Sequence, residues 1–415
     1  MDYHFLFEVA LILFCTKLLS MMCKKIRMPQ VVGALFAGLL IGPAMLGILE
    51  ANDFLDKISE IGVIALMFAA GLETDIQELK KTGKASFVIA VMGVLIPLAG
   101  GYFIASMFNV GPDVFLQNLF IGVILTATSV SITVETLKEM GKLSTKSGNA
   151  ILGAALIDDI LGIIALTVIT SVADSSVNIS IVLFKIVAFF ALSLVVGIFL
   201  YKRFNHWFSR YDRDKKRFPI MAFVFCLNYA FIAEHFFGVA DITGAFFAGL
   251  VLSNTRRVTY VASRMEIVSF MLLSPVFFAN IGLKVVLPPM SKELIIFSTL
   301  LIIVAVLSKI LGCAAGAKAS GFSTHDSICI GTGMISRGEV ALIVAAKGVA
   351  LGLMNSEFYA PIIITVVVTT VITPILLKIV YKGTVDETVN NNLADFYQAP
   401  EDLENLAQKL SENDR

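Results

Sequence analysis

The sequence has little charge for its length and few of the residue types that soluble enzymes use. Of its 415 residues only 15% are Asp, Glu, Lys or Arg, whereas 57% are hydrophobic. A soluble domain carries about 25% charged and 45–50% apolar residues. The mean hydropathy of +0.86 cannot be confined to one globular core, because single cores stop growing near about 250–300 residues. The composition excludes an ordinary soluble enzyme and predicts an integral membrane protein.

An excess of either charge sign and the common cofactor motifs are also missing. The 32 basic residues equal the 32 acidic ones, so nothing points to a nucleic acid partner. The five cysteines have no CxxC or Cys/His spacing, which predicts neither a zinc site nor a disulfide framework. No dinucleotide fingerprint, P-loop, HExxH or EF-hand pattern occurs. We therefore expect no cofactor and no nucleotide-binding domain in the chain.

Thirteen apolar segments predict membrane-spanning helices, since a helix that crosses about 30 Å of hydrocarbon needs roughly 20 residues. The segments 58–72 and 239–253 have only fifteen residues each and are the weakest candidates for independent spans. The thirteen segments are 5–22, 31–49, 58–72, 86–107, 115–136, 149–172, 179–200, 218–236, 239–253, 266–287, 294–317, 326–352 and 358–381.

Basic residues in the loops predict the orientation. Lys24, Lys25 and Arg27 follow the first segment and place its end in the cytoplasm, and only Lys57 and Lys292 then fall in loops on the other side. This predicts an outside N-terminus and a cytoplasmic C-terminus in a cell (plasma) membrane. Residues 382–415 are polar and too few for a folded domain, so we expect a short cytoplasmic tail.

Two adjacent carboxylates, Asp158 and Asp159, lie in the middle of the apolar segment 149–172. A charge at the bilayer centre costs at least about 2.5–3.5 kcal/mol, so one that is kept there marks a functional site. Adjacent helical residues point about 100° apart, so one carboxylate can face a cavity and the other a neighbouring helix. Two carboxylates this close are hard to ionise together. The pair suits an exchange of protons for metal cations, and a structural pair held by hydrogen bonds alone is the alternative.

Lys309 is a further charge in the middle of an apolar segment, 294–317, and it needs an anion. Asp158 or Asp159 is the natural partner. A salt bridge between the helices would then link the acidic pair to the Lys309 ammonium, which can itself take part in proton coupling.

Hydroxyl residues interrupt the segment that precedes the Asp pair. Hydroxyl oxygens and freed backbone carbonyls are hard ligands suited to dehydrated Na⁺ or Li⁺. Ser and Thr in membrane helices also bond back to their own carbonyls, so a structural role is equally open for them. The residues are Thr126, Thr128, Ser129, Ser131 and Thr133.

A second interruption contains glycines and charges. Gly331, Gly333 and Gly338 bracket Arg337 and Glu339 inside the segment 326–352. This composition predicts a broken helix whose loose backbone ends are satisfied by polar neighbours. Arg337 and Glu339 are expected to form a buried structural pair, with Glu73 as a possible further member, and direct ion contact is the alternative.

These interruptions occupy matching places in two segment triples, 86–172 and 294–381. The triples begin on opposite sides of the membrane, and their middle members carry the polar residues. An inverted repeat with two broken helices that cross at the midplane is the architecture of a secondary transporter. We expect the Asp pair and Lys309 to flank the crossing.

The motifs resemble those of the cation:proton antiporter-2 family, in its NapA/GerN-type bacterial Na⁺/H⁺ antiporters. The similarity covers the chain to about Tyr381 and is carried by TATSVSITVETLKEMG, ILGAALIDDILG, PVFFANIGL, the Lys309 segment and GMISRGEVALIVA. The resemblance implies an all-α polytopic fold with about thirteen transmembrane helices, an inverted repeat with two crossing discontinuous helices, and a homodimer.

The resemblance also implies a division of labour along residues 1–381. An ion-translocating core, 86–172 and 294–381, would move against a dimerisation scaffold, 1–72 and 218–287, with 179–200 as the linker helix. Asp159 resembles the principal ion-binding carboxylate of the family, and Asp158 resembles the one that pairs with the lysine at the place of Lys309. Thr128 and Ser129 resemble ligands in the unwound helix, and Arg337 with Glu339 matches a charge pair near the crossing.

The sequence therefore predicts a transporter, not an enzyme, in which Na⁺ or Li⁺ and H⁺ compete for Asp159 and Asp158. Two carboxylates with a lysine favour electrogenic exchange. A K⁺/H⁺ exchanger or K⁺ efflux protein of the same fold is the nearer alternative, although the Kef systems carry Gln-Asp at the paired position and a nucleotide-binding domain. An intramembrane aspartyl hydrolase is the farther one, but it typically uses a GxGD setting, which does not occur here.

Overall fold

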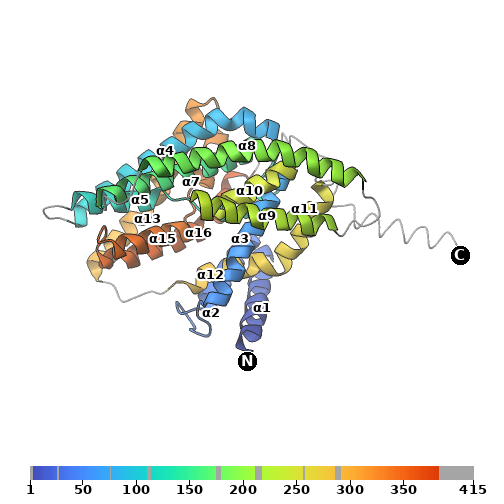
Figure 1. Cartoon of the computed structure of the whole chain (residues 1–415). Coiled ribbons are helices and arrows are strands. Elements are labelled where there is room, and N and C mark those ends of the chain that lie inside the picture. The colour runs from blue at the N-terminus through green and yellow to red at the C-terminus, as the bar shows by residue number, and fades with distance from the viewer. Residues whose placement is uncertain are drawn as a thin grey trace.

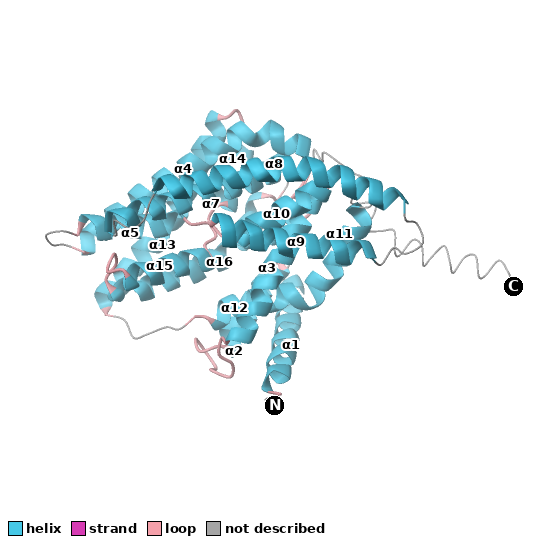
Figure 2. Cartoon of the chain, in the orientation of Figure 1, coloured by secondary structure: helices cyan, strands magenta, loops and turns pink. Residues whose placement is uncertain are grey.

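The computed structural model describes residues 3–382 except 26–27, 75, 110–113, 174–178, 211–216, 256–257 and 286–290. Every regular element in this part of the chain is a helix, as Figure 2 shows. Nine helical runs among the described residues are long and apolar enough to cross a membrane. The predicted tail at 382–415 lies almost wholly outside the described residues. An all-helical, multi-pass membrane protein is thus the observed fold class.

Each of the thirteen predicted segments falls on one or more helices. The helices are α1 (His4–Lys25), α2 (Gln30–Ile41), α3 (Asp53–Glu73), α4 (Ile76–Phe108), α5 (Phe115–Thr126), α6 (Val130–Glu139), α7 (Lys146–Ala173), α8 (Ile179–Arg210), α9 (Arg217–Phe237), α10 (Asp241–Leu252), α11 (Val258–Val268), α12 (Ser274–Leu283), α13 (Lys292–Ala319), α14 (Thr324–Gly333), α15 (Glu339–Ala350) and α16 (Tyr359–Val380). A π-helical turn, Ser269–Leu273, joins α11 to α12, and a short 3₁₀ turn, Ser356–Phe358, precedes α16.

Two of the boundaries that differ from the prediction have a reason in local backbone chemistry. The segment predicted at 31–49 is helical only to Ile41, because Gly42 adopts an extended conformation and Pro43 follows it. The short segment predicted at 58–72 is part of a longer helix that starts at Asp53. Asn52 caps that start, since its side chain accepts a hydrogen bond from Leu55 N at 2.9 Å.

The helices form two groups that we name by position. The crossing group consists of α4–α7 and α13–α16, in which α4 packs against α5, α7 and α13, and α13 packs against α14 and α16. The flanking group consists of α1–α3 and α9–α12, in which α3 packs against α10 and α12, and α2 packs against α1 and α12. Between these groups lies the long helix α8, which contacts α7 on one side and α9 and α10 on the other (Figure 1).

Glycines let backbones touch inside each group. In the flanking group, a Cβ on Gly71 of α3 would lie 2.2 Å from the Phe246 carbonyl of α10. In the crossing group, a Cβ on Gly122 of α5 would lie 2.5 Å from the Leu98 carbonyl of α4. Close approach of helices at small residues is a main source of stability in membrane proteins. Each group is therefore tightly packed within itself.

Candidate functional site

Two helices of the crossing group are broken where the sequence predicts polar interruptions. The backbone is non-helical at 127–129, between α5 and α6, and again at 335–338, after a turn at Met334 that ends α14. A break leaves N–H and C=O groups without intrahelical partners, and these groups must find others when they are buried. The two breaks meet each other and supply part of what is missing.

Hydrogen bonds tie the two breaks together. Ser129 N donates to Ser336 O at 2.7 Å, and Ser336 Oγ donates to Ser129 O at 2.8 Å. Thr133 Oγ1 donates to Gly333 O at 2.7 Å and lies 3.0 Å from Ser336 Oγ. A side chain at Gly338 would collide with Ser129, because a Cβ there would lie 2.7 Å from its Oγ. The two broken helices therefore cross in direct contact, in the arrangement that the inverted repeat predicts.

Arg337 sits at this crossing as a buried guanidinium with 1% of its surface exposed. It donates to three backbone carbonyls, Ile335 O at 2.9 Å, Leu125 O at 2.7 Å and Ala305 O at 3.2 Å. Leu125 lies in the last turn of α5, so the guanidinium compensates the partial negative charge at that helix end. Thr370 of α16 donates to the Arg337 carbonyl. Arg337 thus binds the loose ends of the broken helices.

The sequence predicts a structural pair between Arg337 and Glu339, with Glu73 as a possible member. The described contacts of Arg337 go to carbonyl groups, and the Glu339 side chain lies outside what the structure describes. Glu73 belongs to a different contact, because Lys138 Nζ lies 2.9 Å from its Oε1. Glu73, the last residue of α3, is therefore paired with α6, and none of the described contacts of Arg337 goes to it.

An ion pair lies next to the crossing. Lys309 Nζ of α13 is 3.0 Å from Asp158 Oδ1 and 3.1 Å from Oδ2, with α7 carrying the carboxylate. The two side chains are 0% and 1% exposed. Of the two partners that the sequence offers for Lys309, the structure has Asp158. Such a pair can exist in an apolar interior because each charge replaces the water that the other has lost.

The backbone of α4 covers this pair closely. A Cβ at Gly93 would lie 2.6 Å from Cys313 Sγ, 3.7 Å from Lys309 Nζ and 3.9 Å from Asp158 Oδ1. Cys313 stands one turn after Lys309 on α13 and is fully buried. Gly93 and Cys313 are residues that the sequence reasoning missed, since an isolated glycine and an isolated cysteine in apolar segments carry no motif.

Asp159 is the next residue on α7 and is half-buried, whereas Asp158 is buried. Adjacent positions diverge by about 100° around a helix, so the two carboxylates leave α7 in different directions. Thr128, in the first break, is buried close to the Asp158 carboxylate. The crossing, the acidic pair and Lys309 therefore form one contiguous site.

The other hydroxyls of the first interruption differ in what they contact. Thr126 Oγ1 bonds back to Val123 O at 2.7 Å, which is the structural role left open for such residues. Ser129 Oγ lies 3.3 Å from Ser131 Oγ, and Thr133 is engaged with the second break. Thr128 is thus the residue of this stretch beside the Asp pair, and Ser129, like Thr133, contacts the second break.

A cavity of about 310 Å³ lies between the groups at the N-terminal end of α3. It is lined by Val340 and Leu342 of the crossing group and by flanking-group residues that include Asn280. Asn280 Nδ2 donates to Asp56 Oδ1 at 2.7 Å, and Lys284 Nζ lies 2.8 Å from the same oxygen. Asn280 therefore both joins α12 to α3 and lines the cavity.

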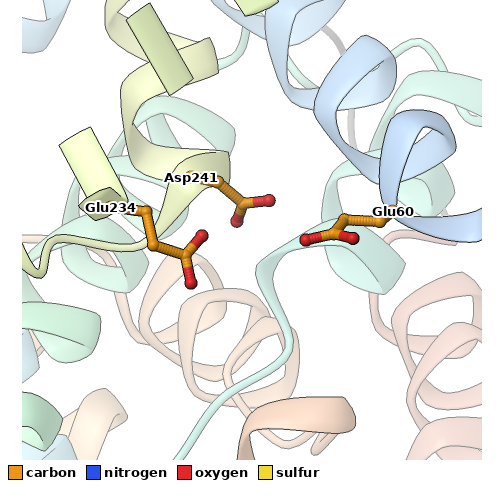
Figure 3. Close-up of side chains that lie close together, drawn as sticks. All are labelled: Glu60, Glu234 and Asp241. Carbon is orange, nitrogen blue, oxygen red and sulfur yellow. The ribbon is translucent and has the colours of Figure 1, made fainter. Parts of the chain in front are cut away.

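Three carboxylates gather at this cavity. Glu60 of α3, Glu234 of α9 and Asp241 of α10 offer oxygens that all lie within 4.8 Å of one another. Figure 3 shows Glu60 facing the other two across the space between the helices. The sequence alone does not bring these residues together, because the three come from separate helices. Their negative charge attracts cations to this mouth of the cavity.

Comparison with known proteins finds one matching family and several similar antiporters. The sequence profile of the family described as sodium/hydrogen exchanger, transmembrane, matches residues 10–383. The chain is 38% identical to the Na⁺/H⁺-K⁺ antiporter GerN of Bacillus cereus over 367 residues, 88% of this chain and 93% of that protein. It is 36% identical to a Na⁺/H⁺ antiporter of Enterococcus hirae over 371 residues, 88% of this chain and 94% of that protein.

A solved structure shares the fold. The sodium proton antiporter MjNhaP1 of Methanocaldococcus jannaschii matches with a TM-score of 0.70 over 92% of this chain and 96% of that one, at 19% identity. The predicted fold class and the expectation of a transporter instead of an enzyme agree with these relatives. Because the family profile matches most of the chain and the relatives are similar over most of their own length, the chain belongs to the sodium/hydrogen exchanger family.

Proposed function

We propose that this chain is a secondary antiporter that exchanges Na⁺ or Li⁺ for H⁺. The observation that carries the proposal is the buried ion pair of Asp158 and Lys309 beside Asp159, at the contact between two broken helices. A fixed pair at this depth holds one carboxylate ready without leaving it uncompensated. The names of the relatives, which are Na⁺/H⁺ antiporters, support the same activity.

In the proposed mechanism the cation and the proton compete for one site. Asp159 is the principal ion-binding carboxylate, and Thr128 and Ser129 contribute oxygen ligands from the first break. When a cation binds, Asp158 turns from Lys309 toward it, and Lys309 recovers its partner when the cation leaves. Because a single site cannot hold both cation and proton, each delivery of one requires removal of the other.

Transport also requires that the site opens to each face in turn. We assign the crossing group, within 86–172 and 294–381, as the moving unit and the flanking group, within 1–72 and 218–287, as the dimerisation scaffold, with α8 as the linker. The tight glycine contacts inside each group support movement of the groups as bodies. We place the N-terminus outside and the C-terminus in the cytoplasm, from the loop charges, and the protein as a homodimer in a bacterial plasma membrane.

K⁺ is the second candidate cation. The relative GerN is named a Na⁺/H⁺-K⁺ antiporter, which favours K⁺ as a further substrate of this chain. A K⁺-only efflux protein of the same fold is the competing function. Movement of one net charge through 100 mV is worth about 2.3 kcal/mol, so electrogenic exchange, which we also propose, would increase the gradient that the protein sustains.

The test is dissipation of a pH gradient in proteoliposomes on separate addition of Na⁺, Li⁺ or K⁺. Wild type is compared with Asp159→Asn, which keeps the size of the side chain and removes its charge. Asp53→Asn is the matched control, because Asp53 is an exposed aspartate at the start of α3. Valinomycin with K⁺ clamps the voltage in the Na⁺ and Li⁺ runs.

We expect a Na⁺ or Li⁺ response that falls by about a hundredfold or more in Asp159→Asn, since the binding charge is lost, and stays at the wild-type level in Asp53→Asn. Normal exchange by a folded Asp159→Asn variant would sink the site assignment. A response to K⁺ alone would move the protein to the efflux function, and no response to any cation would refute antiport.

A further inference from the structure

Helix α2 begins without a cap from its own neighbourhood. The residue before it, Pro29, makes no side-chain cap hydrogen bond, although the first N–H groups of a helix need acceptors and carry partial positive charge. Gln30 N instead donates to Glu139 Oε2 at 2.6 Å, and the Val31 N–H faces the same carboxylate. The cap of a flanking-group helix is therefore a side chain of α6, in the crossing group.

A second polar contact between the groups stands beside the first. Lys138 of α6 pairs with Glu73, the last residue of α3, at 2.9 Å, and the side chains are 19% and 12% exposed. Glu135 and Glu266 also attract the Lys138 ammonium. A half-buried cation among several carboxylates is held more firmly than an exposed surface pair. The last two residues of α6 thus reach two different helices of the flanking group.

The contact between the groups has a different character elsewhere. Where α16 faces α2 and α12, the surfaces that meet are mostly apolar and leave a small gap, with Leu35 and Leu39 on one side and Val367 and Val371 on the other. Apolar surfaces have no directional bonds and can slide past one another at little cost. The polar contacts of α6 therefore fix the relative position of the two groups. The apolar contact of α16 does not.

We infer that Lys138 and Glu139 are positioning residues that hold the crossing group against the flanking group, and that both contacts open when the crossing group moves. The inference rests on the proposed function, in which one group moves against the other. By the loop charges this end of α6 faces the cytoplasm, so the contacts join the two groups on that side. Neither residue lies at the ion site, so both act on which face of the site is open and not on the binding of the ion.

The chain contains a natural reporter of this opening. Cys23, on α1 of the flanking group, is half-buried and lies within electrostatic reach of Glu139. Cys313, inside the crossing group next to Lys309, is fully buried. Because residues of α1, α2 and α6 line one cavity, separation of α6 from these helices should expose Cys23 further and leave Cys313 covered, whereas unfolding exposes both.

The experiment measures the rate of maleimide labelling of each cysteine in the full chain in nanodiscs, by peptide mass spectrometry, for Glu139→Gln and Lys138→Gln. Lys138→Arg keeps the cation and should keep the contact. Lys284→Gln is the matched control, because it breaks the Lys284–Asp56 pair, which is of similar length and lies within the flanking group. Initial rates of Na⁺-driven proton exchange are measured on the same variants in proteoliposomes.

We expect Cys23 labelling to rise about threefold or more in Glu139→Gln and Lys138→Gln, as loss of a polar contact between the groups predicts, with Cys313 unlabelled. The maximal exchange rate should change by a similar factor in these two variants. Lys138→Arg and Lys284→Gln should stay within about twofold of wild type in both measurements.

Labelling of Cys23 at the wild-type rate in both Glu139→Gln and Lys138→Gln would overturn the inference, as would an equal rise in Lys284→Gln. A rise in Cys313 labelling together with Cys23 would also overturn it, because the variants would then merely unfold. The labelling measurement does not depend on transport. A wild type that moves no cation would refute the proposed function and still show whether the contacts of α6 open.

Discussion

Two lysine–aspartate pairs in this molecule have almost the same length and opposite surroundings. Lys309–Asp158, in the crossing group, is 3.0 Å long with side chains 0% and 1% exposed. Lys284–Asp56, in the flanking group, is 2.8 Å long with side chains 40% and 43% exposed. Water can replace either partner of the second pair but neither partner of the first. Distance alone therefore says little about what a pair does, and burial decides it.

The difference explains why only one of the pairs suits exchange chemistry. A buried pair loses stability if one charge leaves and nothing replaces it. In the proposed mechanism, a cation that binds beside Asp158 compensates that carboxylate while Lys309 releases its proton, so opening of the pair is coupled to ion exchange. In an exposed pair, water replaces a partner that moves away, so opening of the pair is not coupled to the binding of an ion.

The largest expected effect comes from removal of the buried cation. Lys309→Ala leaves the Asp158 charge uncompensated and should lower the free energy of unfolding by about 3–5 kcal/mol. Urea titration in detergent micelles measures the change. Lys284→Ala, treated identically, should lose no more than about 1 kcal/mol. Equal losses in the two variants would show that burial does not separate the pairs.

A double variant sharpens the same contrast. Lys309→Ala combined with Asp158→Asn should recover about 1–3 kcal/mol relative to Lys309→Ala alone, because the uncompensated carboxylate is gone. The matched double variant Lys284→Ala with Asp56→Asn should recover nothing measurable. A double variant at the buried site that is less stable than Lys309→Ala would contradict this assignment of the loss to an unpaired charge.

The cover over the buried pair gives the third effect. Gly93→Ala would place a methyl group 2.6 Å from Cys313 Sγ, and this overpacking should cost about 1–3 kcal/mol of unfolding free energy. Gly83, on the same helix, has open space around it, so Gly83→Ala should gain up to about 1 kcal/mol. The same unfolding titration compares them, and a stable Gly93→Ala would mean that α4 does not hold the pair closely.

Salt dependence is the smallest effect. The loss in Lys284→Ala, of at most about 1 kcal/mol, should shrink toward zero at about 1 M choline chloride, since salt screens exposed charges. The loss in Lys309→Ala should persist under the same conditions. Choline is used because it adds ionic strength without adding a transported cation. A salt-insensitive loss at Lys284 would show that this pair is shielded from solvent.

The sequence predicted the helices and the breaks well because both depend on local composition. Apolar length gave the spans, and the hydroxyl and glycine stretches around Thr128 and Gly338 coincide with the non-helical backbone. The premature end of α2 followed from Gly42 and Pro43, a local signal that the apolar count overlooked. The nature of the partner of Lys309 could also be predicted, because a buried ammonium requires an anion and the candidates were few.

What the sequence could not supply were contacts between residues distant in the chain whose partners are backbone groups. Arg337 donates to the carbonyls of Leu125, Ile335 and Ala305, partners that the expected pair with Glu339 did not include. Glu139 caps a helix 109 residues away. Every residue has a carbonyl and nearly every residue an N–H, so composition gives no indication of which ones a distant side chain will reach.

The guanidinium at the crossing has a consequence for the speed of turnover. The carboxyl end of a helix, such as that of α5, carries about half a negative elementary charge, and an uncompensated end beside Asp158 and Asp159 would deepen the energy well for a metal ion. Arg337 compensates that partial charge, because its guanidinium donates a hydrogen bond to Leu125 O. In the proposed mechanism the well is then shallower, and a bound ion escapes faster. A transporter must release its ion in every cycle, so moderate affinity allows faster turnover than very tight binding.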